Sequence, residues 1–366
     1  MRIFRFEKWF VDVLTPARDY MIFFHTLLEV FGFRICFIEV NISRFREEDN
    51  YHLNRKLKVI KRSGHTISTK QGHILYEEGM GKMMLLLDGM EIELNIIPVH
   101  PSDFNCGGMI IRNRGGGFLE WKPLYLKSMV SGRIRIAREG EQDMDEEKFT
   151  GTGYADYLIS TMSPFRIPVR QLYWGRLHSP DLDMTFSYAL GNEKNALRTP
   201  GEATETSDEG PGSLNEEPNS FNDEPRSEEE PRSEEVSGVP DEIIGAQMMV
   251  QTGGETIRFS KISIHADRWE EFVPPDISCP VSYIVEASSK RIKLVLKVVH
   301  LKRAIVSEFM KNPKELGRLP MAMMRRLTRE PKGIKFFSLA SLEFELDGQN
   351  RKLDEVLMID EYVRFK

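Results

Sequence analysis

An acidic residue close to aromatic side chains is the feature of the sequence that most suggests chemistry. Tyr154 and Asp156 lie in the segment Gly151–Tyr157, and residues two apart in a β-strand share one face. On an inward face, burial would disfavour the ionised carboxyl and raise its pKa, which makes Asp156 a candidate proton donor. A purely structural hydrogen-bonding role for Asp156 is an equally good interpretation.

A second pair of residues with the same spacing follows closely. Trp174 and Arg176 would share a face of a neighbouring strand. An arginine within ion-pair distance would keep Asp156 ionised, whereas an apolar, aromatic surrounding would keep it protonated. The sequence leaves open which of these neighbours dominates.

Strand patterns surround these residues and predict the elements that position them. A hairpin with one solvent-exposed face is predicted over Lys82–Leu87, the turn Asp88-Gly89 and Met90–Ile96. In its second strand, apolar residues alternate with Glu91, Glu93 and Asn95. The same period of two runs through Arg291–Leu301, and through Ser341–Leu346 with a return over Leu353–Ile359. One short amphipathic helix is expected at Met321–Arg329. The predicted fold class is all-β, with two barrels or sandwiches.

Residues 195–240 have a composition that cannot form a packed core. The segment is rich in Glu, Ser, Pro, Asn and Gly, and it contains the hexapeptide Glu-Pro-Arg-Ser-Glu-Glu twice in tandem. Residues 199–240 hold 13 acidic residues and two arginines, a net charge of −11, so the rest of the chain carries +5 of the total −6. We predict a disordered acidic insertion.

The insertion also bears on the domain organisation. Asp183–Leu190 before it and Ile243–Gln251 after it both read as strands, so the insertion is expected at a hairpin tip. If these strands pair, the first domain spans residues 1–260 and the second spans residues 261–366. A chain of 366 residues is long enough for two domains.

Several short motifs together resemble a known family. Gly153-Tyr154-Ala155-Asp156-Tyr157-Leu158 and Trp174-Gly175-Arg176 stand where that family has Gly-Tyr-His-Asp-His-Asn and a Trp-Gly-Arg strand. Upstream, Trp121-Lys122-Pro123 and Val130-Ser131-Gly132 are similar to its Trp-x-x-Pro and Val-x-Gly elements. The family is the carotenoid 1,2-hydratase (hydroxyneurosporene synthase) and AttH-like group. The resemblance implies two lipocalin-like β-domains.

The resemblance also implies a chemistry and roles for individual residues. A carboxylic acid protonates a trisubstituted alkene, aromatic rings stabilise the carbocation by cation–π attraction, and water or an internal nucleophile captures it. On this view the catalytic residues are Asp156 and Tyr154. The ligand would contact Trp121, Tyr157, Trp174 and Arg176.

The chain departs from the family pattern on both sides of the acid. Ala155 and Tyr157 replace the two histidines, and Leu158 replaces the asparagine, so half of any His-Asp relay is missing. Whether the protein is an enzyme is therefore open. One hypothesis is acid-assisted hydration, cyclisation or isomerisation of an isoprenoid or polyene. A second is a carrier of a lipid-like ligand, and a third is a scaffold that recruits basic partners through its acidic segment.

Other classes of function find little support in the sequence. No phosphate loop, Gly-x-Ser-x-Gly elbow or His-Glu-x-x-His motif occurs, and three scattered cysteines and eight scattered histidines indicate no metal site. We expect no cofactor. The basic cluster Arg55, Lys56, Lys58, Lys61 and Arg62 comes with no nucleic-acid module, but it is compatible with peripheral contact with an anionic membrane surface. The absence of a signal-peptide pattern and of paired cysteines predicts a cytoplasmic protein.

Overall fold

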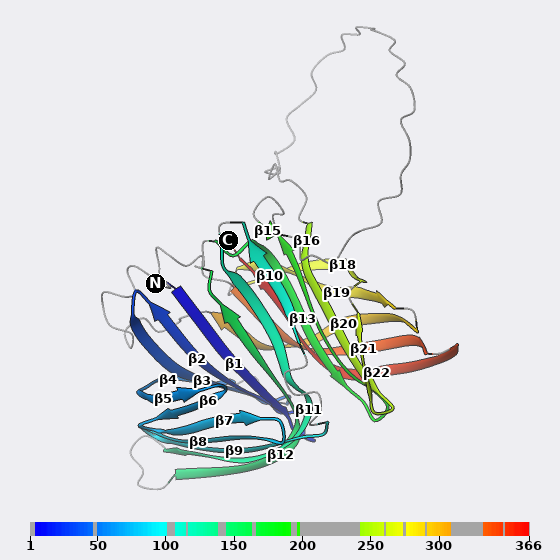
Figure 1. Ribbon diagram of the computed structural model, residues 1–366. Coiled ribbons are helices and arrows are strands. Elements are labelled where there is room, and N and C mark those ends of the chain that lie inside the picture. Colours follow the sequence, from blue (N-terminus) through cyan, green and yellow to red (C-terminus); the bar gives the residue numbers. More distant parts are fainter. Residues whose placement is uncertain are drawn as a thin grey trace, which may run out of the picture.

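The computed structural model describes residues 4–46, 50–100, 107–114, 116–137, 144–162, 166–191, 196–197, 242–259, 261–273, 276–289, 291–308, 332–346 and 348–365. Within these residues the chain forms β-strands and no α-helix, arranged as two strongly curved sheets side by side (Figure 1). The all-β fold class predicted from the sequence is confirmed. No helix in this part of the chain is long and apolar enough to span a membrane.

The first sheet holds the N-terminal strands. They are β1 (Phe4–Leu14), β2 (Tyr20–Val30), β3 (Phe33–Ser43), β4 (Asn50–Leu57), β5 (Val59–Ser63), β6 (Thr66–Thr69), β7 (Gly72–Glu77), β8 (Met80–Leu87), β9 (Met90–Pro98), β10 (Met109–Asn113), β11 (Phe118–Ala137), β12 (Met144–Ser160) and the short β15 (Ala196–Leu197). Their order is β4-β3-β2-β1-β12-β11-β9-β8-β7-β6-β5, and β10 pairs with β11 and β15.

The second sheet holds the remaining strands. They are β13 (Val169–His178), β14 (Asp183–Gly191), β16 (Glu242–Thr252), β17 (Glu255–Phe259), β18 (Lys261–Phe272), β19 (Ile277–Ser288), β20 (Ile292–Glu308), β21 (Lys332–Leu346) and β22 (Gln349–Arg364). Their order is β17-β16-β14-β13-β22-β21-β20-β19-β18.

Both sheets are strongly curved, and a short connection joins the two edge strands of each (Figure 1). The edge strands β4 and β5 follow one another with only Lys58 between them, and the edge strands β17 and β18 are separated by residue 260 alone. Two Cα steps span at most about 7 Å, so the last residue of one edge strand lies close to the first residue of the other edge strand in each sheet.

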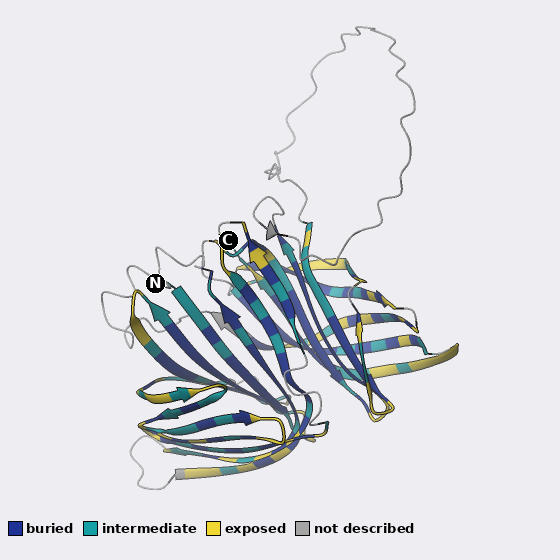
Figure 2. Ribbon diagram, in the orientation of Figure 1, coloured by how far each residue is buried: buried dark blue, intermediate teal, exposed yellow. Residues whose placement is uncertain are grey.

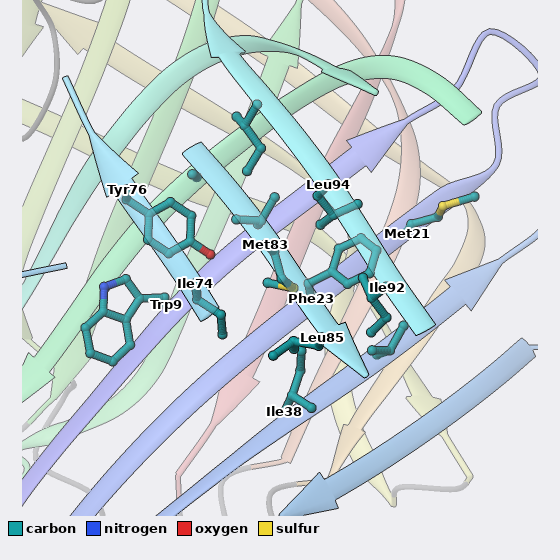
Figure 3. Packing of buried hydrophobic residues seen from close by; sticks show 14 of the residues in the cluster. Trp9, Met21, Phe23, Ile38, Ile74, Tyr76, Met83, Leu85, Ile92 and Leu94 are labelled. Carbon is teal, nitrogen blue, oxygen red and sulfur yellow. The ribbon is translucent and has the colours of Figure 1, made fainter. Parts of the chain in front are cut away.

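The buried residues fall into three clusters, one inside each barrel and one between the barrels. The first barrel's interior is lined from β1, β2, β3, β7, β8 and β9 by side chains such as Trp9, Phe23, Ile74 and Met83 (Figure 3). The second barrel has its own interior cluster. The third cluster takes residues from both sheets, including Phe10 and Trp174, so the facing strands are buried on both sides (Figure 2).

Period two explains which side chains reach the third cluster from β1 and β12, and from β13 beyond its register shift between Val169 and Gln171. On β1, Trp9 and Val11 point into the first barrel while Phe10 points to the second barrel. On β11 the register shifts twice between Pro123 and Ser128. Such a bulge inserts a residue and reverses the faces beyond it, which lets Trp121 face the interface while Tyr125 faces the first barrel's interior.

The hairpins predicted from the sequence are confirmed. Strand β8 pairs with β9, and β21 pairs with β22 across a turn that contains Gly348. Strands β14 and β16 pair from Asp183↔Gln251 to Gly191↔Glu242, so the acidic insertion lies at a hairpin tip as expected. Most of the insertion and the expected helix at Met321–Arg329 lie outside the described residues.

The division of the chain differs from the expected boundary at residue 260. Strand β12 ends in the first sheet at Ser160 and β13 begins in the second sheet at Val169, and β17 and β18, before and after residue 260, both belong to the second sheet. The sequence interpretation placed the insertion-bearing hairpin in the first domain, but β14 and β16 pair beside β13 in the second sheet. Alternation within strands specifies faces, and it carries no information on which sheet a hairpin joins.

Candidate functional site

The structure places Tyr154, Asp156, Trp174 and Arg176 at the interface between the barrels. Tyr154 and Asp156 lie on one face of β12, as the strand period predicted, and Trp174 and Arg176 lie on the facing side of β13. All four are buried, and Asp156 is only 7% exposed. Trp121 of β11 joins them from the first barrel.

Asp156 is held in an environment that favours its protonated form. The Trp121 Nε1–H donates a hydrogen bond of 2.9 Å to Asp156 Oδ2. Burial raises the pKa of Asp156 to about 7, although the hydrogen bond from Trp121 and the nearby Lys335 ammonium both act to lower that pKa. A carboxyl with a pKa near neutrality is half protonated at physiological pH, so it can give and regain a proton.

Two buried donors near Asp156 make no hydrogen bond of regular geometry, although the Tyr154 hydroxyl lies near enough to Asp156, Thr185 and Trp174 to interact with them. These are the Tyr154 hydroxyl and the Trp174 Nε1–H, and the two rings are in contact with centroids 5.4 Å apart. Burial and the Asp156 charge raise the pKa of Tyr154 well above its usual value, so its hydroxyl stays protonated. Buried polar groups are normally paired, so two donors without a regular hydrogen bond near an acid indicate a place for an acceptor atom.

Arg176 does not pair with Asp156, which answers the question that the sequence left open. Its Nε–H donates to Asp12 Oδ2 of β1 at 2.6 Å, and both side chains are almost fully buried. Asp12 also accepts hydrogen bonds from the Tyr20 hydroxyl (2.9 Å) and from the Tyr154 backbone N–H (3.0 Å). This network links β1, β12 and β13 across the interface, and it leaves desolvation as the dominant effect on Asp156.

The aromatic rings at the interface already surround a cation of the protein. The Lys335 Nζ lies 4.7 Å from the centroid of the Trp174 ring and 4.8 Å from that of Phe10. Lys335 is buried and pairs with Glu361 of β22. Cation–π attraction to Lys335 therefore uses the ring faces that a substrate carbocation was expected to use.

Tyr157 does not belong to this group. It lies on the opposite face of β12 and points into the first barrel. There its ring centroid is 4.9 Å from that of Trp9 and 4.8 Å from that of His65. The reason is the strand period, since residues 154 and 156 share a face and residue 157 cannot. Of the residues expected to contact a ligand, Tyr157 is therefore on the other side of β12 from Trp121 and Trp174.

Two glycines of the recognised motifs are required by close packing. A Cβ at Gly153 would lie 2.6 Å from the Asp12 carbonyl oxygen, and a Cβ at Gly175 would lie 2.3 Å from Met358 Cε. Gly153 brings β12 close to Asp12, and Gly175 makes room inside the second barrel between Trp174 and Arg176. Gly153 therefore sets the close approach of β12 to β1, and Gly175 serves the packing inside the second barrel.

A pocket of about 350 Å³ opens beside Arg176 at the interface. Its lining comes from both barrels: Leu14, Lys127, Thr152, Arg176, His178, Ser179, Pro180, Leu357 and Ile359. His178 Nδ1 donates to Asp183 Oδ1 (3.1 Å), and the Lys127 ammonium lies 2.9 Å from the same oxygen. Asp156 does not line this pocket, and of the polar residues that do, only Arg176 was predicted from the sequence.

A second polar cluster lies inside the second barrel. His300 Nε2 donates to Asp360 Oδ2 at 2.7 Å, and Asp360 also accepts from the Tyr283 hydroxyl (2.9 Å) and from Ser338 Oγ. The His300 ring stacks on Phe336 with centroids 3.8 Å apart. Both oxygens of the Asp360 carboxyl have donors, while the buried His300 Nδ1 has no hydrogen-bond partner among the described residues.

The other tryptophans and the basic cluster have different environments. Trp9 is part of the first barrel's core, and Trp269 is 43% exposed. Of the five basic residues, Arg62 forms an ion pair with buried Glu7 at 2.8 Å, while Lys56, Lys58 and Lys61 are exposed. Contact with an anionic surface stays a prediction. Among the described residues, no group of three or more His, Cys, Asp and Glu side chains is arranged to hold a metal ion.

Comparison with known proteins gives similarity at the level of structure. No family model and no curated protein matches the chain. An AttH-like protein of Nitrosomonas europaea aligns over 99% of this chain and 92% of its own, with a TM-score of 0.56 and 15% identity. CghA, in a crystal structure with Sch210972, aligns over 99% of this chain and 89% of its own, with a TM-score of 0.54 and 8% identity. Kievitone hydratase of Nectria haematococca aligns with a TM-score of 0.47 and 8% identity.

At these identities the AttH-like protein and CghA establish the fold alone. Their alignments run through both barrels and cover nearly all of each chain. The chain therefore has the lipocalin-like two-barrel fold that these proteins share.

Proposed function

We propose that this protein binds a mainly apolar small molecule between its barrels and protonates it from Asp156. Hydration, cyclisation or isomerisation of a C=C bond would follow, and the resemblance seen in the sequence makes an isoprenoid or polyene the expected substrate class. The observation that carries the proposal is the buried Asp156 carboxyl, with a pKa of about 7, near the Tyr154 hydroxyl and the Trp174 Nε1–H, neither of which makes a hydrogen bond of regular geometry.

The pKa of Asp156 suits a general acid. Acid catalysis is most effective when the donor's pKa lies near the working pH, because the group is then both protonated and able to release its proton. Trp121 fixes the carboxyl in one orientation through its Nε1–H. The missing histidines of the sequence motif would have to be replaced by another route for the returning proton, and the nearby Lys335 and Lys8 ammonium groups are candidates.

The same two donors suit the second half of such a reaction. The Tyr154 hydroxyl and the Trp174 Nε1–H can together hold an oxygen atom close to the acid. That atom would be the water that captures the cation, or an oxygen of the substrate that acts as internal nucleophile.

A carrier without chemistry is the second candidate, and one observation favours it. Lys335 already lies against the rings of Trp174 and Phe10, and its charge would repel a substrate carbocation there. A carrier needs only an apolar site with a few polar contacts. The CghA structure with Sch210972 supports small-molecule binding as a use of this fold.

Mass spectrometry in heavy-oxygen water separates the two candidates. The full chain is incubated with isoprenoid and polyene lipids in H₂¹⁸O, and organic-solvent extracts are compared for the wild type, Asp156→Asn and the control Asp354→Asn. Asp354 is a matched aspartate because it is exposed and pairs only with Lys352 at the surface.

The outcomes are distinct. A product with heavy oxygen or a rearranged skeleton, lost in Asp156→Asn and kept in Asp354→Asn, is expected for the acid catalyst. Unchanged lipid bound equally by all three proteins would mean a carrier. Failure of every lipid to bind would contradict both candidates.

A further inference from the structure

The pocket beside Arg176 contains two buried polar atoms without a partner. These are Arg176 Nη2 and His178 Nε2, both on β13 and both in residues that line the pocket. The two side chains are 1% and 7% exposed, so bulk water does not satisfy them. Unpaired polar atoms in a cavity indicate a ligand with complementary atoms.

Arg176 offers a donor to this ligand. Its Nε–H donates a hydrogen bond to Asp12 Oδ2. The hydrogens on Nη2 have no acceptor. A guanidinium in this position prefers a carboxylate or phosphate oxygen, because charge-assisted hydrogen bonds are the strongest it can form. The ligand atom facing Nη2 is thus an acceptor, preferably anionic.

His178 offers an acceptor. A carboxylate can only accept, so the hydrogen shared with Asp183 belongs to His178 Nδ1, and Nε2 of the neutral ring carries a lone pair. Burial and the Arg176 charge lower the pKa of His178, while Asp183 and Asp12 act to raise it. The net effect is a pKa below the usual value for histidine. The ligand atom facing Nε2 must therefore bring a proton with it.

The charges around the pocket limit the ligand to a single negative charge. Arg176 is balanced by Asp12 and Lys127 by Asp183, so the site with neutral His178 has no net charge. A monoanion together with one proton on His178 keeps this balance, whereas a phosphate dianion would leave a buried negative charge. Leu14, Pro180, Leu357 and Ile359 supply apolar walls for the rest of the molecule.

We propose that this pocket binds the carboxyl group of an amphipathic monocarboxylic acid, with Arg176 donating to one oxygen and His178 sharing a proton with the other. The free acid is a carboxylate at neutral pH, so the complex takes up one proton from solvent, which bonds to His178 Nε2. No bond within the ligand breaks. The inference is independent of the chemistry proposed for Asp156, which lies outside the pocket.

Titration calorimetry with octanoate and 1-octanol tests the proposal on the wild-type chain. The two probes have the same eight-carbon chain, so only the head group differs. We expect octanoate to bind at least about tenfold more tightly, as for other hydrogen bonds to charged groups. Heats measured in buffers of different ionisation enthalpy should show uptake of about one proton, and the octanoate affinity should fall by up to about tenfold per pH unit above neutrality.

Variants assign this binding to the pocket. Leu357→Trp should abolish octanoate binding by filling the cavity, and His178→Asn should remove the proton uptake. His265→Asn is the control, because His265 is an exposed histidine on β18 that does not line the pocket. Asp156→Asn should bind octanoate like the wild type, so loss of catalysis and loss of acid binding can be told apart.

The wild-type measurements decide the matter even if a variant does not fold. Equal affinities for octanoate and 1-octanol, absence of octanoate binding, or binding without proton uptake would each overturn the proposal. Octanoate binding that survives in folded Leu357→Trp would place the acid elsewhere and overturn it as well.

Discussion

Replacing Asp156 with asparagine should change how the stability of the protein depends on pH. The carboxyl has a pKa of about 7 in the folded protein, against a usual value of 3.8. Below about pH 4 it is protonated in both the folded and the unfolded chain, and it imposes no penalty. As the pH rises from 4 to 7, the unfolded chain releases this proton while the folded protein keeps it, so the free energy of unfolding falls.

The difference in pKa sets the size of the effect. Each pKa unit corresponds to about 1.4 kcal/mol, so Asp156 should remove about 4 kcal/mol from the free energy of unfolding between pH 4 and pH 8. Asparagine has a similar shape and no proton to lose. The stability of Asp156→Asn relative to the wild type should therefore rise by about 4 kcal/mol over this range.

Urea unfolding followed by tryptophan fluorescence at pH 4, 6 and 8 measures this difference. Other groups titrate identically in both proteins, so only the change in the difference with pH is used. The control Asp354→Asn should follow the wild type at every pH, because Asp354 is exposed. A constant difference between Asp156→Asn and the wild type would refute the raised pKa, and a difference that shrinks with pH would show that Asp156 is stabilised as a carboxylate.

Three further substitutions probe the interface. Asp12→Asn should lower the free energy of unfolding by about 3–5 kcal/mol in urea denaturation, because it leaves the buried Arg176 charge without its partner; a loss below about 1 kcal/mol would contradict this. Gly175→Ala should cost about 1–3 kcal/mol in the same assay, since the added Cβ meets packed side chains inside the second barrel; an unchanged midpoint would show that the barrel yields freely. Lys335→Met should raise the pKa of Asp156 further, as seen in a carboxyl ¹³C titration, and a lowered pKa would mean that the ammonium does not stabilise the carboxylate.

The parts of the fold that depend on local pattern could be predicted from the sequence. Alternation of apolar and polar residues identified the β8–β9 and β21–β22 hairpins and placed Tyr154 and Asp156 on one face. Composition identified the acidic insertion, and the flanking strands placed it at a hairpin tip. These features follow from residues that are near neighbours in the chain.

The partners of the site residues could not be predicted in the same way. Arg176 pairs with Asp12, which is 164 residues away, and Lys335 reaches the rings of Phe10 and Trp174 from the other end of the chain. Which charge neighbours which depends on how the two barrels dock, and no local pattern encodes that. His178 and Asp183 were missed for a different reason, because a single histidine five residues before an aspartate is an ordinary pattern until the turn brings them together.

The central claim is that Asp156 is a buried acid poised near neutral pH between the two barrels. A ¹³C NMR titration of aspartate-labelled protein, with Asp156→Asn to assign the resonance, measures its pKa directly. We predict an apparent pKa near 7. A pKa of about 4 or below, close to that of an exposed aspartate, would contradict the claim and with it the role of Asp156 as proton donor.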